Sequence, residues 1–141
     1  MRRTEARELL MQMFYEMDIQ DDFSTEKRIR FLENNGAELT DDRYFASVHE
    51  ACADNKKEID EMINKYGKKW TIKTMNKVDV AILRLAISEI FFSKAVPASV
   101  AINEAVELGK KFGGDNSGKF INGVLGTIAR ELPSDEKKPE K

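Results

Sequence analysis

Residues 100–112 read VAINEAVELGKKF, and after a break at two glycines residues 116–132 read NSGKFINGVLGTIAREL. In each run apolar residues return every three or four positions, which is the period of an amphipathic helix. Three capping residues, Asp115, Asn116 and Ser117, stand where the second helix would begin. The predicted inward residues are Ala98, Ile102, Ala105, Gly109 and Phe112, then Ile121, Val124, Leu125, Ile128 and Leu132. The stretch therefore predicts two helices joined by a tight turn.

The predicted start of the second helix also carries Lys119 and Phe120. Unpaired backbone N–H groups, a cation and an aromatic ring are groups that nucleic-acid contacts use. An ordinary helical hairpin, with Phe120 in the core, explains the same residues. The stretch taken alone favours the hairpin, and both interpretations stay open.

Composition favours a single all-helical domain over residues 1–132. The chain has 141 residues, of which 41% are hydrophobic and 34% charged. Its three prolines all lie at Pro97 or later, and no alternating β pattern is bounded by turn residues. Residues 133–141 are charged and contain proline, so they are expected to form a disordered tail.

The same composition argues against several classes of function. The net charge is −2, so any nucleic-acid-binding surface must be local. With one cysteine, one histidine and no phosphate-binding or nucleophile motif, we expect no enzyme, no metal and no cofactor. His49 is expected at or near the surface. Without a signal peptide or an apolar run long enough to span a membrane, a cytoplasmic protein is expected.

Further helices are expected over residues 5–17, 24–36, 41–65 and 76–93, with a break or bend at 54–57. Ile29 and Leu32 are the predicted core residues of the second. The helix at 76–93 is apolar nearly all round, which predicts a buried central helix. Asp79, in its first turn, is expected to face outward, where a protein partner could use it.

Two further basic segments stand out. Arg2, Arg3 and Arg7 form a compact group at the N-terminus, with Gln12 and Tyr15 further along the same helix. This group suits a contact surface, although a solvated terminus explains it equally well. Residues 65–77 carry five lysines, two aromatic residues and no acid. We interpret that segment as a connector whose Trp70 anchors in the core, with a nucleic-acid track as the alternative.

Three blocks of sequence resemble the NusB family of bacterial transcription antitermination factors over nearly the whole chain. They are Ala6-Arg7-Glu8 with Gln12-Met13-Phe14-Tyr15, then residues 78–84 (VDVAILR) with Glu89, and then residues 97–125, above all AINEA at 101–105 and KFINGVL at 119–125. The resemblance implies about seven helices in two small bundles packed across each other, and no catalysis.

The resemblance also implies a function and partners. Members of this family pair with the small ribosomal-subunit protein NusE and bind the single-stranded boxA element of nascent ribosomal RNA leaders. They promote read-through by the RNA polymerase elongation complex together with other Nus factors. A homodimer is possible for the free protein. A helical protein–protein scaffold, or a free-standing RNA-binding module related to those of ribosomal RNA methyltransferases, is the alternative.

Matching the blocks residue by residue implies the contact residues. The RNA-binding residues would be Arg2, Arg3, Arg7, Gln12, Asn116, Lys119 and Phe120. Tyr15 and Asp79 would bind the protein partner. The chain departs from the family at two of these positions or their neighbours, because family members often carry Asp at 116 and His at 118, where this chain has Asn116 and Gly118.

Overall fold

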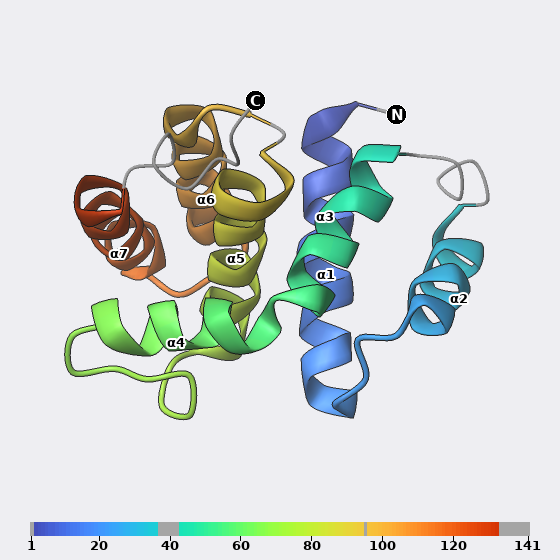
Figure 1. Cartoon of the computed structure of the whole chain (residues 1–141), viewed down its shortest axis with the longest axis horizontal. Coiled ribbons are helices and arrows are strands. Elements are labelled where there is room, and N and C mark those ends of the chain that lie inside the picture. The colour runs from blue at the N-terminus through green and yellow to red at the C-terminus, as the bar shows by residue number, and fades with distance from the viewer. Residues whose placement is uncertain (1, 37–42, 95, 133–141) are drawn as a thin grey trace.

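The computed structural model describes residues 2–36, 43–94 and 96–132. These residues form seven α-helices and one π-helical turn, shown in Figure 1, and contain no strand. The elements are α1 (Arg3–Gln20), α2 (Thr25–Asn35), α3 (Arg43–Asp54), α4 (Lys56–Tyr66), α5 (Lys77–Ile87), η2 (Ser88–Ser93), α6 (Ala98–Phe112) and α7 (Ser117–Glu131). The predicted all-helical fold is confirmed. The expected tail at 133–141 and the start of the helix expected at 41 lie outside the described residues.

The helices form two groups, with α1, α2 and α3 on one side of Figure 1 and α4, α5, α6 and α7 on the other. The α5–η2 segment lies between them and contacts α1, α3, α6 and α7. Every residue from Val80 to Phe91 is buried. The prediction of a central helix near 76–93 is therefore confirmed, because a helix that is apolar nearly all round can bury its surface against several neighbours.

Local signals explain several helix boundaries. The side chain of Ser24 accepts a hydrogen bond from the backbone N–H of Lys27 and so caps α2. Asn76 caps α5 in the same way, by accepting from Val78. The expected break between α3 and α4 falls at Asn55, and Gly67 follows the last residue of α4 as its C-cap.

Ile29 is not the core residue that the pattern predicts, since it is 45% exposed while Phe31 and Leu32 are buried. The prediction is therefore wrong at Ile29 and confirmed at Leu32. A helix of three turns offers too few apolar positions to fix the inward face from sequence. The structure also places His49 differently from the prediction, because this residue is 1% exposed.

The tautomer of His49 follows from its partners. Arg28 can only donate, and its Nη1 lies 2.9 Å from His49 Nδ1. The carbonyl oxygen of Phe23 can only accept, and it lies 2.9 Å from Nε2. The ring is therefore neutral, with its proton on Nε2. Burial lowers the pKa of His49 below its ordinary value, and the nearby Arg28 lowers it further.

This arrangement predicts a pH-dependent stability. His49 binds its proton at lower pH in the folded protein than in the unfolded chain. The stability that the neutral ring contributes is therefore fully present above pH ~6.5, and it is lost as the pH falls from there toward the pKa of His49 in the folded protein. We expect the melting temperature to fall between pH 7 and pH 5. His49→Gln, which cannot titrate, should show a flatter profile over this window. Equal slopes for the two proteins would contradict the prediction, since His49 is the only histidine.

None of the helices in the described ranges is long and apolar enough to cross a membrane.

Candidate nucleic-acid interface

The turn between α6 and α7 is built on close backbone contact. A Cβ atom at Gly109 would lie 2.8 Å from Cδ1 of Ile121 and 3.2 Å from the backbone nitrogen of Gly118. Gly118 is itself buried, and a Cβ there would lie 2.9 Å from Cγ of Lys110. Gly118 therefore lets the end of α6 approach the first turn of α7, with Lys110 lying across it.

Ser117 and Asn116, two of the capping residues predicted at the start of α7, differ in their hydrogen bonding. Ser117 is buried, and its Oγ accepts a hydrogen bond of 2.9 Å from the backbone N–H of Gly114. Asn116 occupies the cap position, but its side chain makes no capping bond and is exposed. The Asn116 amide therefore lies open to solvent at the start of α7.

Lys119 is exposed, whereas Phe120 is half-buried and packs partly against the core. Phe120 also lines a surface pocket of about 530 Å³. One part of Phe120 therefore packs against the core, and another part borders open space.

The opposite wall of this pocket comes from the segment between α4 and α5. Trp70 is 42% exposed and lines the pocket, so the prediction that it anchors in the core is wrong. Met75, which is 6% exposed, supplies the apolar contact instead. The Nζ of Lys69 lies 5.5 Å from the centre of the Trp70 ring.

The loop that carries Trp70 is internally ordered. The backbone N–H of Trp70 donates to the carbonyl of Gly67 at 3.0 Å, and the N–H of Ile72 donates to Asn64 Oδ1 at 2.9 Å. A Cβ at Gly67 would lie 2.4 Å from the carbonyl oxygen of Trp70, so only glycine permits this turn. The position of Trp70 is therefore fixed by the loop's own hydrogen bonds.

Asp79 does not face outward as expected. It is 6% exposed, lines the same pocket, and its Oδ1 has no hydrogen-bond partner among the described residues. Burial raises the pKa of the Asp79 carboxyl, and the Ser117 hydroxyl beside it opposes that rise. The helical period could not reveal this, because α7 covers the first turn of α5 only in the folded chain.

The three N-terminal arginines are placed very differently from one another. Arg2 is exposed. Arg3 is exposed too, with its guanidinium carbon 4.0 Å from the centre of the Tyr44 ring. Arg7 is 4% exposed and binds Glu89 through Nε and Nη2, at 3.0 Å each. Arg2 and Arg3 can meet a phosphate, whereas the guanidinium of Arg7 is already committed to a buried carboxylate.

The remaining contact residues of α1 lie on another face. Gln12 follows Arg3 by nine residues, which is half a turn out of phase in a helix of 3.6 residues per turn. Gln12 and Tyr15 are exposed, and Tyr15 is 36% exposed. Glu8, on the same face as Tyr15, accepts from Nζ of Lys111 at 2.8 Å, so this side of α1 is turned toward α6.

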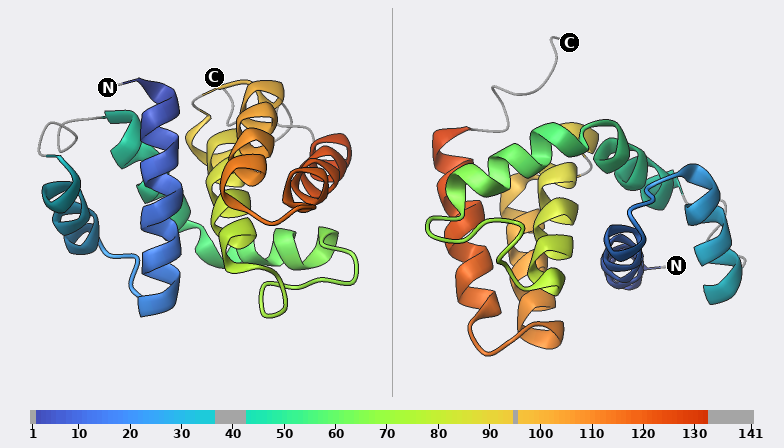
Figure 2. Two further views of the ribbon diagram at one scale, coloured as in Figure 1. Left: turned by 180° about the vertical axis from the view of Figure 1, so that it is seen from behind. Right: turned by 90° about the horizontal axis from the view of Figure 1, so that it is seen from below.

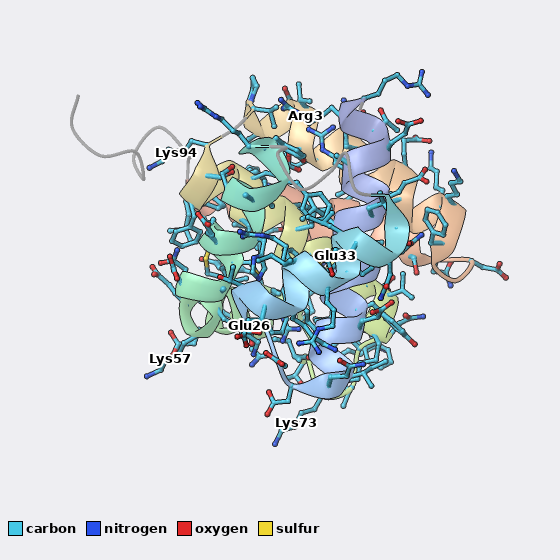
Figure 3. All side chains as sticks on the ribbon, turned by 90° about the vertical axis from the view of Figure 1, so that its right-hand side faces the viewer. Arg3, Glu26, Glu33, Lys57, Lys73 and Lys94 are labelled. Carbon is cyan, nitrogen blue, oxygen red and sulfur yellow. The ribbon has the colours of Figure 1, made fainter. Side chains whose placement is uncertain are left out.

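The candidate contact residues are thus spread over more than one face of the molecule. The left view of Figure 2 shows α1 and α6 running next to each other on one face, with α6 leading down to the α6–α7 turn. Figure 3 labels Arg3 at the upper end and Lys73, from the loop of Trp70, at the lower end. A ligand that met both ends would have to span the molecule, as an extended strand can.

Fold and surface together define an all-helical protein with exposed cationic and aromatic side chains around the start of one helix. A family model described as the NusB family matches residues 4–130. The chain belongs to the NusB family.

Curated relatives agree with this assignment. The transcription antitermination protein NusB of Acetivibrio thermocellus is 42% identical over 130 residues, which cover 92% of this chain and 90% of that protein. The protein of the same name from Geotalea uraniireducens is 40% identical, and the match covers 95% of this chain and 98% of that protein.

Solved structures share the fold. NusB of T. maritima superposes with a TM-score of 0.82 at 32% sequence identity. The match covers 97% of this chain and 96% of the T. maritima chain. A chain in the crystal structure of the antitermination factors NusB and NusE in complex with dsRNA superposes with a TM-score of 0.80 at 25% sequence identity. The match covers 92% of this chain and 97% of the chain in that complex.

Proposed function

We propose that this chain is a transcription antitermination factor that binds RNA together with a protein partner. The observation that carries the proposal is family membership over residues 4–130, joined to the similarity with a chain solved in complex with NusE and RNA. The finer proposal is that the partner is NusE and the RNA is the boxA element of nascent ribosomal RNA leaders. The complex then promotes read-through by RNA polymerase with the other Nus factors, in the cytoplasm.

Exposed rings support a single-stranded ligand. Sequence-specific RNA-binding proteins stack unpaired bases on aromatic side chains, whereas duplexes are contacted mainly along the backbone. Phe120 and Trp70 both border open space beside exposed lysines. Arg2, Arg3 and Lys119 are proposed to contact phosphates, and Asn116 and Gln12 to add hydrogen bonds.

The protein partner is proposed to cover the face of α1 that carries Tyr15. Ile19, four residues later, is 61% exposed, so the two side chains form an apolar strip. We do not include Asp79 in this surface, because its carboxylate is buried under α7. Arg7 has a structural part in the proposal, since it holds α1 against η2.

Replacing Phe120 or Lys119 tests the RNA site. Phe120→Ala should cost about 1–3 kcal/mol of RNA affinity if the ring stacks on a base. Lys119→Ala should reduce the salt slope of binding by about 1, because one phosphate contact is lost. The measurement is fluorescence anisotropy of a short single-stranded boxA RNA over a KCl series, with and without NusE.

Phe120→Leu is the matched control, because it keeps apolar packing and removes the ring. Wild-type affinity in Phe120→Ala and Lys119→Ala would refute the assigned site. A chain that binds NusE equally well with and without RNA, and never binds RNA, would instead be a protein–protein scaffold.

A further inference from the structure

We infer that Tyr44 is a positioning residue for RNA binding: its ring holds the guanidinium of Arg3 by the face and leaves the N–H edges free to bind one phosphate. The inference deepens the proposed function and rests on it, since it takes Arg3 as a phosphate contact. The two residues meet where the first turn of α1 lies beside the start of α3, near the top of Figure 1. No pattern along α1 predicts that a residue of α3 has this role.

The contact between Arg3 and Tyr44 uses the face of the ring. The guanidinium carbon of Arg3 lies 4.0 Å from the ring centre, well within the distance at which a cation is attracted to an aromatic ring. A guanidinium stacked in this way keeps its N–H donors at its edges available. Among the residues that the structure describes, no carboxylate forms an ion pair with Arg3. Its fork of donors is therefore held in place without being occupied.

Arg7, one turn further along α1, shows the opposite arrangement. Its guanidinium carbon lies 5.7 Å from the centre of the same ring, and its Nε and Nη2 donate to Glu89 at 3.0 Å each. A phosphate that approached Arg7 would have to displace a buried ion pair, whereas a phosphate at Arg3 displaces no carboxylate. Tyr44 thus lies between an arginine that holds the fold and an arginine that is open to a ligand.

The ring of Tyr44 is itself fixed at both ends. It is half-buried and packs against the hydrophobic core. Its hydroxyl donates a hydrogen bond of 2.6 Å to Oε2 of Glu89. Burial and the charge of Glu89 raise the pKa of Tyr44, so the hydroxyl remains a donor. The ring therefore forms a rigid platform under Arg3.

A guanidinium that is already held should bind a phosphate more tightly than a mobile one. A long side chain that becomes ordered only on binding loses conformational entropy at that moment, and prior stacking removes part of this cost. The planar fork of arginine also matches two phosphate oxygens at once. Because Arg3 is exposed, its contact with Tyr44 should contribute to RNA affinity and little to folding stability.

Two substitutions separate the ring of Tyr44 from its hydroxyl. Tyr44→Phe keeps the stacking face and loses the bond to Glu89, so its thermal midpoint should fall while its RNA affinity stays within about twofold of wild type. Tyr44→Leu removes the face and should bind RNA about three- to fivefold more weakly. Tyr66→Leu is the matched control, because that ring on α4 also has a cation over it, Lys65 Nζ at 5.3 Å, and it should bind RNA like wild type.

Variants of Arg3 show whether Tyr44 acts through Arg3. Arg3→Ala should bind RNA about tenfold more weakly and reduce the salt slope by about 1. Arg3→Lys should keep the slope, since the charge remains, but lose affinity with the fork. In the Arg3→Ala background, Tyr44→Leu should cause no further loss, because the contact that it removes no longer exists. The measurement is fluorescence anisotropy of short single-stranded boxA RNA with NusE, at a temperature where circular dichroism shows every variant folded.

The outcomes separate this inference from the proposed function. An equal loss from Tyr44→Leu with and without Arg3, or a loss in Tyr44→Phe as large as in Tyr44→Leu, would overturn the inference. Wild-type RNA affinity in Arg3→Ala would overturn it too. RNA binding that still depends on Lys119 and Phe120 would then leave the proposed function standing. If the wild type does not bind boxA RNA in the presence of NusE, both proposals fail.

Discussion

Arg84→Ala should destabilise the folded protein by about 3–5 kcal/mol, because it leaves two carboxylates without their buried cation. Arg84 is 1% exposed, and its Nε and Nη2 donate to Asp60 at 2.9 and 3.0 Å. Its Nη1 forms an ion pair with Asp18 at 2.9 Å. Burial alone would raise the pKa of Asp18, but Arg84 holds it below the ordinary value. Arg84 thus joins α1, α4 and α5 through one side chain.

Urea denaturation followed by circular dichroism measures this loss, and the thermal midpoint should fall by roughly 10 °C or more. Arg130→Ala is the matched control, since Arg130 is exposed and its Nη2 donates a hydrogen bond to Thr127 on the same helix. That variant should stay within about 0.5 kcal/mol of wild type. Similar losses in the two variants would mean that the Arg84 cluster does not hold the helices together.

Sequence periodicity was sufficient to place those helices that carry local signals. The break at Asn55, the cap at Ser24 and the apolar run of α5 are all readable within a few residues. Periodicity does not predict the surroundings of four polar residues in the middle of α5–η2. They appear as interruptions of an apolar helix, yet these four are buried: Asp79, Arg84, Ser88 and Glu89.

Burial of these groups depends on partners that are distant in sequence. Arg84 meets Asp60, and Glu89 meets Arg7 eighty-two positions away. No spacing rule along one helix predicts such pairs. The same limit explains Trp70, which sits in a loop whose path is set by Gly67 and Met75 and not by a helical period.

The candidate site was predictable only in part. Lys119 and Phe120 could be singled out because a helix start is visible in the sequence. The pocket beside them could not, since it needs the 69–79 segment to lie against the α6–α7 turn. Resemblance to the NusB family named Arg7 as an RNA contact, but no residue near Arg7 in the sequence reveals that Glu89 already binds it.

That placement changes what Arg7→Ala is expected to do. Glu89 is 1% exposed and would keep only the Tyr44 hydroxyl, which donates to its Oε2 at 2.6 Å. Burial and the adjacent Glu89 raise the pKa of Tyr44, so its hydroxyl stays protonated but adds no positive charge. An unpaired buried carboxylate should cost about 3–5 kcal/mol of stability. Arg7 Nη1 also lies 3.6 Å from Oε1 of Glu104 on α6. Loss of the Arg7 side chain should therefore loosen α1 from both η2 and α6.

A double variant separates this structural role from RNA contact. Replacing both Arg7 and Glu89 by methionine leaves no unpaired charge, so most of the stability lost in Arg7→Ala should return. Arg3→Ala, one turn earlier on the same face, serves as the control and should change stability little. If Arg7 only positions α1, the double variant should bind RNA like wild type at a temperature where both are folded. A weaker RNA affinity in that variant, with its unfolding free energy restored, would show instead that the Arg7 guanidinium leaves Glu89 and reaches the phosphate backbone.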